Sequence, residues 1–141
     1  MIRKASDKDY PVLIDIWESA VLATHDFLSK QDFEDIKNKL PFYFRNVDLY
    51  VFMGDNENVQ GFLGVSTDKI EMLFIDDKYR GKGIGKALMM FAIDTLYIRK
   101  VDVNEQNIPA VGFYERFGFK VYQRSPSDGE GKDYPILHLS L

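Results

Sequence analysis

A basic, glycine-rich segment at residues 80–85, Arg-Gly-Lys-Gly-Ile-Gly, constrains the fold of this chain more than any other feature. It follows an apolar run at residues 70–75 and precedes a helical pattern that begins at Lys86. The first N–H groups of a helix have no backbone partners and carry positive partial charge, so phosphate oxygens bind there. Glycines have no Cβ and let the backbone approach a phosphate closely. A strand, this turn and a helix therefore predict an anion site.

Two familiar nucleotide-binding motifs do not fit this segment. A P-loop has a glycine six residues before its lysine and a serine or threonine after it, but Arg80 and Ala87 stand at those places around Lys86. The dinucleotide motif needs a third glycine three residues after Gly83, where Lys86 stands instead. The sequence thus disfavours a nucleotide-binding module.

The spacing Arg-x-x-Gly-x-Gly after a strand resembles the acyl-CoA pyrophosphate loop of the GNAT superfamily of N-acetyltransferases. Residues 103–119 add a second resemblance, because an asparagine-containing loop is followed by a helix that ends in Phe113-Tyr114 and then by Gly-Phe. Two motifs in this order and at this separation are more specific than either motif alone. The whole chain can be laid on the GNAT plan, and it is similar to small single-domain bacterial members of that superfamily.

The resemblance implies an α+β fold, the GNAT fold, with a mixed, mostly antiparallel sheet of six to seven strands and helices on both faces. Residues 1–141 would form a single GNAT domain. The strand at residues 70–75 would diverge from a strand at residues 100–103, and acetyl-CoA would lie in the V-shaped gap. The implied activity is transfer of the acetyl group of acetyl-CoA to a primary amine by direct attack in a ternary complex. The alternative is a non-catalytic acyl-CoA-binding or regulatory protein with the same fold.

Composition limits the partners and the location. The 141 residues suit one domain, and no apolar run approaches the roughly 20 residues of a membrane span. A formal net charge of −4 disfavours nucleic acid as a partner, whereas an amine acceptor, either a small molecule or a peptide, is compatible with that charge. The chain has no cysteine and no acidic or histidine cluster with ligand spacing, so we expect no metal. With no secretory signal pattern, we expect a cytoplasmic protein without a membrane partner.

Apolar periodicity and turn residues predict the order of helices and strands. Helix-start signals occur at Ser6 and Ser29, and Pro41 should bend or end the second helix. Gly118 should cap the last helix. We expect further helices at residues 86–96 and 108–117, and strands at residues 49–53, 59–66, 70–75, 97–103, 119–124 and 134–141.

Tyr114 and Glu71 are the candidate catalytic residues. The resemblance places a proton-donating tyrosine at Tyr114, and a phenol with a pKa of about 10 is protonated at neutral pH. The alternative for Tyr114 is a ring that packs on the sheet. Glu71 is the candidate base, because it is a carboxylate inside an apolar strand that would border the acetyl site. The alternative is a solvated position, because Glu71, Leu73 and Ile75 should share one face of the strand and Ile70, Met72 and Phe74 the other.

The resemblance also implies which residues contact the substrates. His25 and Asp26, between the first two helices, would contact the acceptor amine, and the alternative is that they cap the loop. Asn107 would contact the cofactor or hold the neighbouring backbone. The cofactor would contact Leu73, Phe74, Ile75, Arg80, Gly81, Lys82, Gly83, Ile84, Gly85 and Lys86. His138 alternates with apolar neighbours, and we interpret it as structural.

Overall fold

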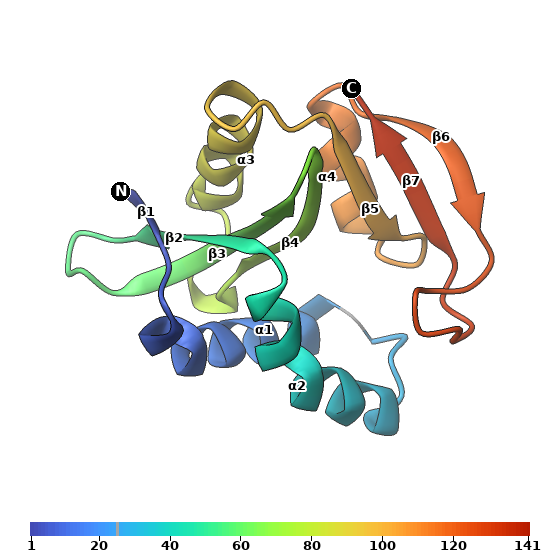
Figure 1. Cartoon of the computed structure of the whole chain (residues 1–141), viewed down its shortest axis with the longest axis horizontal. Helices are drawn as coiled ribbons and strands as arrows, with labels where there is room; N and C mark the ends of the chain where they lie inside the picture. The colour runs from blue at the N-terminus through green and yellow to red at the C-terminus, as the bar shows by residue number, and fades with distance from the viewer. Residues whose placement is uncertain (25) are drawn as a thin grey trace.

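A computed structural model describes residues 1–24 and 26–141 of the chain. Its helices are α1 (Tyr10–Thr24), α2 (Lys30–Arg45), α3 (Ile84–Asp94) and α4 (Ile108–Arg116), and two short 3-10 helices are η1 (Asp7–Asp9) and η2 (Asp77–Tyr79). Its strands are β1 (Ile2–Lys4), β2 (Asp48–Met53), β3 (Val59–Ser66), β4 (Lys69–Ile75), β5 (Lys100–Asn104), β6 (Lys120–Ser125) and β7 (Ile136–Ser140). Figure 1 shows how these elements are arranged.

In the described residues, seven strands form one sheet in the order β1-β2-β3-β4-β5-β7-β6. Neighbouring strands are antiparallel except for β4 and β5, which are parallel. A parallel pair needs a crossover connection, and α3 provides it. This mixed, mostly antiparallel sheet confirms the predicted fold class.

The strands β4 and β5 diverge soon after they begin. Only two residue pairs join them in the described structure, Lys69 with Lys100 and Ile70 with Val101. Figure 1 shows the two strands separating toward their carboxyl ends. The predicted divergence is therefore confirmed. It divides the sheet into two parts, which we call the N-terminal wing (β1–β4) and the C-terminal wing (β5–β7).

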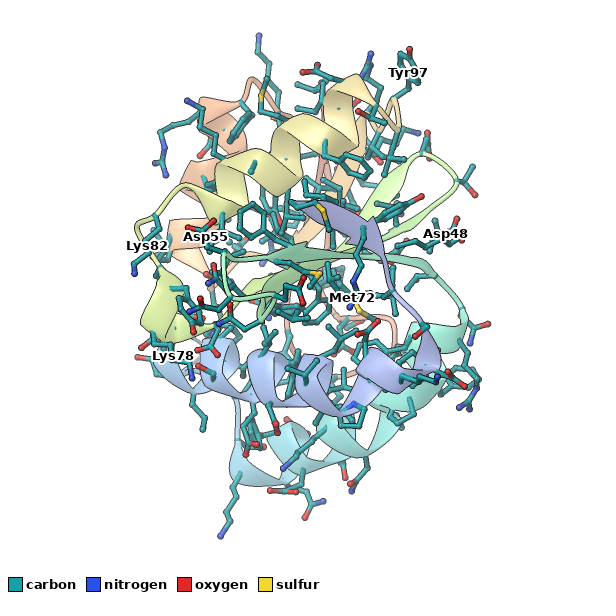
Figure 2. The ribbon with its side chains drawn as sticks, turned by 90° about the vertical axis from the view of Figure 1, so that its left-hand side faces the viewer. Asp48, Asp55, Met72, Lys78, Lys82 and Tyr97 are labelled. Carbon is teal, nitrogen blue, oxygen red and sulfur yellow. The ribbon has the colours of Figure 1, made fainter. Side chains whose placement is uncertain are left out.

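Helices cover both faces of the sheet. On one face, which we call the front, α1 and α2 pack against β2, β3 and β4 through a core that includes Trp17, Phe44 and Phe62. On the back face, α3 and α4 pack through a second core that includes Leu88 and Tyr114. Figure 2 shows α3 on one side of the sheet and the pair α1 and α2 on the other. The expected placement of helices on both faces is confirmed.

One strand was not predicted, and another begins three residues later than expected, at 100 instead of 97. Strand β1 was not predicted, because three residues are too few to show the alternation of a strand; it pairs Ile2 with Phe52. Strand β5 begins at Lys100 rather than at residue 97. Tyr97 has a φ of 58°, which lies in the left-handed region and is incompatible with a strand.

Helix α2 continues through Pro41 to Arg45, so of the two expected outcomes at that residue, a bend or an end of the helix, the end is wrong. A proline inside a helix removes one backbone hydrogen bond, which favours a break there. Leu40 and Phe44 are both almost fully buried in the front core. Their burial holds the last turn against the sheet, and this tertiary contact outweighs the local preference.

A bulge in β4 changes the faces of its first residues. Gly64 of β3 pairs with Met72, and the next residue, Val65, pairs with Ile70, so Glu71 is an extra residue on β4. As a result, Ile70 packs into the back core whereas Met72 packs against the front core. The expectation that Ile70 and Met72 share one face is therefore wrong.

Candidate active site

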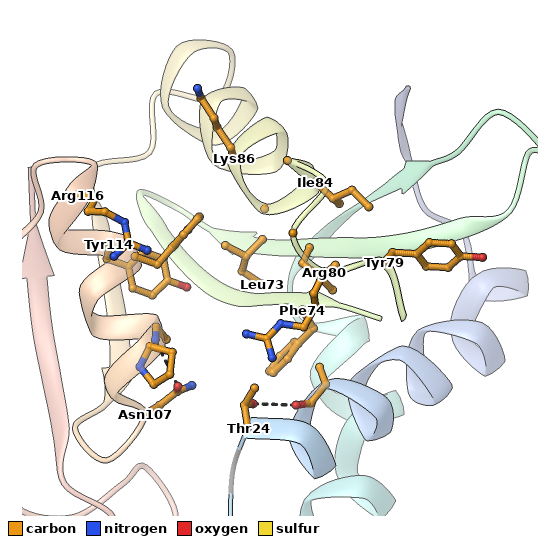
Figure 3. A pocket seen from close by; sticks show the side chains of 18 residues that line it. Thr24, Leu73, Phe74, Tyr79, Arg80, Ile84, Lys86, Asn107, Tyr114 and Arg116 are labelled. Atoms are coloured by element: carbon orange, nitrogen blue, oxygen red, sulfur yellow. Dashed lines mark hydrogen bonds between the residues drawn. The ribbon is translucent and has the colours of Figure 1, made fainter. Parts of the chain in front are cut away.

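A cavity of about 450 Å³ lies where β4 and β5 have diverged. Its walls come from the carboxyl ends of β4 and α1, from the glycine-rich segment and from α4 (Figure 3). The lining residues are Ala20, Thr24, Leu73, Phe74, Ile75, Tyr79, Arg80, Gly81, Gly83, Ile84, Gly85, Lys86, Asn107, Pro109, Ala110, Phe113, Tyr114 and Arg116. Apolar walls with a few converging polar groups are typical of a small-molecule site.

The glycine-rich segment faces the cavity with its backbone. Gly81 and Gly83 have φ values of 76° and 82°, which favour glycine. Gly83 is the N-cap of α3, and apart from the adjacent backbone no heavy atom lies within 4 Å of the point where a Cβ would sit at Gly81 or Gly83. Outside the helices and strands of the described chain, no backbone hydrogen bond has its donor at residues 81–83. Residues 84–86 form the first turn of α3, where the N–H groups have no partner within the helix. These N–H groups are therefore available to an anion.

Basic side chains add positive charge around this backbone. Those that line the cavity are Arg80, Lys86 and Arg116. Arg80 lies 3.6 Å from a carboxylate oxygen of Asp77, whereas no ion pair holds Arg116 within residues 1–24 and 26–141. Lys82 does not line the cavity. Its Nζ lies 5.6 Å from the ring centroid of Tyr79, and the side chain is at the edge of the molecule (Figure 2).

Tyr114 lies on α4 with its hydroxyl directed into the cavity (Figure 3). The residue is only 7% exposed, and its ring packs against Phe113 and Phe119 at centroid distances of 5.5 and 6.0 Å. Burial raises the pKa of the Tyr114 phenol, because the phenolate is poorly solvated there. Tyr114 therefore keeps its proton at neutral pH and can donate it to a group in the cavity.

Asn107 is the N-cap of α4 and also lines the cavity. Its Oδ1 accepts a hydrogen bond from the N–H of Ala110 at 3.3 Å, and the residue is 9% exposed. This contact satisfies one of the unpaired N–H groups at the start of the helix. The observed role is thus to hold the neighbouring backbone, and contact with a cofactor stays a prediction.

The other predicted site residues are placed differently. Glu71 does not line the cavity; its side chain is exposed and its Oε1 accepts a hydrogen bond from Ser66 Oγ at 2.8 Å. Asp26 is exposed and also lies outside the lining residues. His25 lies outside the residues that the structure describes. The fold therefore brings Tyr114 to the glycine-rich segment but does not bring Glu71 or Asp26 into the cavity lining.

His138 has hydrogen-bond partners at both ring nitrogens. Nδ1 lies 2.7 Å from Asp102 Oδ1, and Nε2 lies 2.7 Å from Ser125 Oγ. Asp102 is also paired with Lys69 at 2.9 Å. These contacts join β4, β5, β6 and β7, which supports the structural interpretation of His138.

Sequence reasoning missed one face of α4 and the end of α1. Pro109, Phe113 and Arg116 line the cavity at helical positions i, i+4 and i+7. That spacing could have identified Arg116 from the sequence, because it places this cation on the same face of α4 as Pro109 and Phe113. Ala20 and Thr24 reach the cavity only because α1 packs on β4, and no local pattern indicates this contact.

The arrangement combines an anion-binding backbone with a protonated phenol in one cavity. Such a site can hold a phosphorylated co-substrate at one end and protonate a leaving group at the other. Among the described side chains, no group of three or more His, Cys, Asp or Glu could hold a metal ion. In the same part of the chain, no helix is long and apolar enough to cross a membrane.

Comparison with known protein families decides among the possible co-substrates. Residues 19–132 match the family described as the acetyltransferase (GNAT) domain, which covers most of the chain. The chain belongs to the GNAT family of acetyltransferases. Membership confirms the predicted N-acetyltransferase activity, with acetyl-CoA as the co-substrate.

This GNAT acetyltransferase has relatives over nearly its whole length. It is 39% identical to the peptidyl-lysine N-acetyltransferase YjaB of Salmonella typhimurium, over 98% of this chain and 95% of the relative. The solution structure of apo-form YjaB from Escherichia coli is 36% identical and has a TM-score of 0.92, over 99% of this chain and 95% of that one. The PaiA N-acetyltransferase from Thermoplasma acidophilum, solved in complex with coenzyme A, is 23% identical and has a TM-score of 0.70, over 100% and 98% of the two chains. This third structure has the same fold.

Proposed function

We propose that this GNAT acetyltransferase acetylates the side-chain amine of a lysine in a peptide or protein. Two relatives that are called peptidyl-lysine N-acetyltransferases share 39% and 37% of their residues with this chain over nearly its whole length. A net charge of −4 is compatible with a basic acceptor. Substrate identity depends on the site rather than on the fold, so the acceptor needs a direct test.

One observation carries the proposed mechanism: the glycine-rich segment, with its unpaired N–H groups, and Tyr114 line the same cavity. The N–H groups bind the pyrophosphate of acetyl-CoA, and Leu73, Phe74 and Ile75 flank the thioester arm. The lysine nitrogen attacks the thioester carbon, the C–S bond breaks, and Tyr114 gives its proton to the leaving sulfur. The phenol then regains a proton from solvent.

The attacking nitrogen must also lose protons, because it starts as an ammonium. The exposed position of Glu71, with its carboxylate bonded to Ser66, favours a water molecule as the first proton acceptor over direct transfer to Glu71. Asp26 contributes negative charge near the end of α1, where it would attract the ammonium. The role of His25 stays a prediction.

The alternative function is binding of an acyl-CoA without turnover. Such a protein needs the glycine-rich segment but no proton donor at the thioester. The buried, protonated Tyr114 in the cavity favours the enzyme. We further propose that residues 1–141 act as one domain, because one sheet includes all the described strands, and that the enzyme works in the cytoplasm.

The test uses the full chain, acetyl-CoA and a set of lysine-containing peptides, with free CoA and peptide mass as the two readouts. We expect a gain of one acetyl group on a lysine side chain for each CoA released. Peptides with an acetylated N-terminus and with lysine replaced by norleucine are the controls. Tight acetyl-CoA binding without transfer to any amine would instead support the binding protein.

A further inference from the structure

A loop of the C-terminal wing reaches the N-terminal wing on the front of the molecule. This loop, residues 126–135, joins β6 to β7, and we call it the strap. It lies at the end of the sheet where the two wings have separated (Figure 1). Its side chains contact α2, which packs on the N-terminal wing through the front core. The strap therefore links the two wings at the open end of the V.

The centre of this link is Lys132. Its Nζ lies 2.6 Å from Asp32 Oδ1 and 3.2 Å from Asp35 Oδ2. Tyr134 of the strap donates a hydrogen bond from its hydroxyl to the other oxygen of Asp32. The hydrogen bond from Lys132 lowers the pKa of Asp32, so both members of the pair are charged at neutral pH.

A second pair of contacts lies further along α2. Glu130 of the strap is 3.0 Å from Lys39 Nζ and accepts a hydrogen bond from the hydroxyl of Tyr43 at 2.6 Å. Asp32, Asp35, Lys39 and Tyr43 are spaced at i, i+3, i+7 and i+11, which places them on one flank of the helix. The strap thus presents a cation to the acidic part of this flank and an anion to its basic part.

The strap is folded so that these two side chains are held in place. Asp128 Oδ1 accepts hydrogen bonds from the N–H groups of Glu130 and Lys132, at 3.0 and 2.9 Å. Gly131, between them, has a φ of 75°, which permits the tight turn. Because the backbone already holds the turn, less side-chain and loop freedom is lost when the strap contacts α2.

The two walls of the cavity belong to different wings. Leu73 and the glycine-rich segment are attached to the N-terminal wing, through β4 and α3, whereas Tyr114 is on α4, which packs on β5 of the C-terminal wing. In the described part of the sheet, the wings share two pairs of residues. The apolar back core also joins them, but it lies on the opposite face from the strap. On the front of the molecule, the wings are therefore joined by contacts such as those of Lys132.

We propose that Lys132 is a positioning residue, whose contacts with α2 hold the two wings at the spacing that acetyl transfer requires. The proposal rests on the proposed function, because it assigns Tyr114 and β4 to opposite sides of the reacting thioester. Lys132 does not line the cavity, so it acts through the position of α4 rather than by contact with a substrate. A misplacement of about 1 Å can lower a rate on the order of a hundredfold.

The first test compares Lys132→Met with Lys132→Arg in two-substrate kinetics. Lys132→Met removes the charge and keeps the length, so we expect kcat to fall about tenfold and the KM for acetyl-CoA to rise. Lys132→Arg should restore most of the rate. Added salt should lower kcat of the parent toward that of Lys132→Met, because salt screens the ion pairs, and should change the variant less.

Lys37→Met is the matched control. Lys37 is also paired with a carboxylate, Glu18, at 3.2 Å, but both residues lie on the helices of the N-terminal wing. Its loss removes an ion pair without releasing the strap, so kcat should be unchanged. Equal kinetics in Lys132→Met and the parent, or an equal defect in Lys37→Met, would overturn the proposal.

A second test measures the spacing of the wings and does not need activity. The chain has no cysteine, so Asn38→Cys on α2 and Gln123→Cys on β6 can be spin-labelled selectively. We expect the distance distribution between the labels to broaden in Lys132→Met and to stay narrow in Lys37→Met. An unchanged distribution in Lys132→Met would overturn the positioning role. Failure of the parent to acetylate any lysine peptide would instead overturn the proposed function. The distance measurement would still show whether Lys132 holds the two wings together.

Discussion

The glycine-rich segment and the strap both border the V, but they hold their ligands and partners by different means. The segment presents backbone N–H groups whose direction depends on φ at Gly81 and Gly83. The strap uses the charged side chains of Glu130 and Lys132, which are partly exposed. Backbone donors keep their charge distribution at every pH, whereas side-chain ion pairs respond to pH and salt. We therefore expect cofactor binding by the backbone N–H groups to change little with pH, whereas the link between the wings should weaken with added salt and at extreme pH.

The largest effect on turnover is expected from the loss of the Tyr114 hydroxyl, which lies in the cavity between the two wings. Tyr114→Phe removes the proton donor and keeps the ring that packs on Phe113 and Phe119. Turnover should fall about 10²- to 10⁴-fold, the usual scale for a positioned acid, with acetyl-CoA affinity nearly unchanged. Steady-state kinetics and calorimetry measure the two quantities.

The control for this variant is Tyr122→Phe, which removes a hydroxyl from an exposed tyrosine outside the cavity. It should leave turnover as it is. Equal rates for Tyr114→Phe and the parent across the pH range would show that another group, or water, protonates the sulfur.

The next largest effect tests the backbone end. Gly83→Val adds a branched side chain at a φ of 82°, which costs on the order of 1–3 kcal/mol of strain, and it fills the open space next to the N–H groups. We expect acetyl-CoA affinity to fall at least about tenfold, by calorimetry. Lys78→Val, at an exposed position just before the segment, should bind normally. Normal binding by a folded Gly83→Val protein would exclude close approach of the pyrophosphate to this glycine.

A smaller effect is expected from Arg116, the cation that the sequence did not indicate. Its side chain lines the cavity and is part of no ion pair among the described residues, so its charge is available to a phosphate of the cofactor. Arg116→Gln should weaken acetyl-CoA binding about three- to tenfold and reduce the salt dependence of that binding. Arg124→Gln, which breaks a surface pair with Glu105, is the control and should change neither. Identical salt dependence in the parent and in Arg116→Gln would contradict the contact.

The same contrast explains what the sequence could predict. The cofactor end is local: a strand, Gly81, Gly83 and a helix follow one another along the chain, so their spacing is visible in the sequence and the structure has them in that order. Tyr114 was found in the same way, from a short pattern around it. The family resemblance implied a mixed sheet of six to seven strands and the divergence of β4 and β5, and the structure has both features.

The parts that escaped prediction depend on long-range contacts. The contact of Lys132 with Asp32 joins residues 100 positions apart, and no local pattern announces it. The face of Ile70 depends on how β3 pairs with β4, since a bulge appears only in the pairing. Helix α2 passes through Pro41 because of burial in the front core, which propensity does not include.

The pH dependence of stability follows from the charged pairs of the strap. The pKa of Asp32 is lowered in the folded state, first by Lys132 and then by Tyr134. Its contribution to stability is therefore complete above its unfolded value of about 3.9, and is lost as the pH falls through the lower folded pKa. The pKa of Lys132 is raised, chiefly by Asp32, so its contribution is complete below about 10.4 and is lost at higher pH.

The smallest expected effect is accordingly on the unfolding of Asp32→Asn. At pH 7 this variant should unfold at slightly lower urea than the parent, because exposed ion pairs contribute little. Below pH 4 the parent loses the same contribution by protonation of Asp32, so the two midpoints should converge. Asp55→Asn is the control, because Asp55 is exposed in a turn and forms no ion pair in the described structure. Its urea midpoint should match that of the parent. If the difference in urea midpoint between Asp32→Asn and the parent stayed constant from pH 7 to pH 3, the amide would be disturbing the packing of the strap rather than removing a charge. The strap would then not be held by charge, and it would not differ from the glycine-rich segment in the way described above.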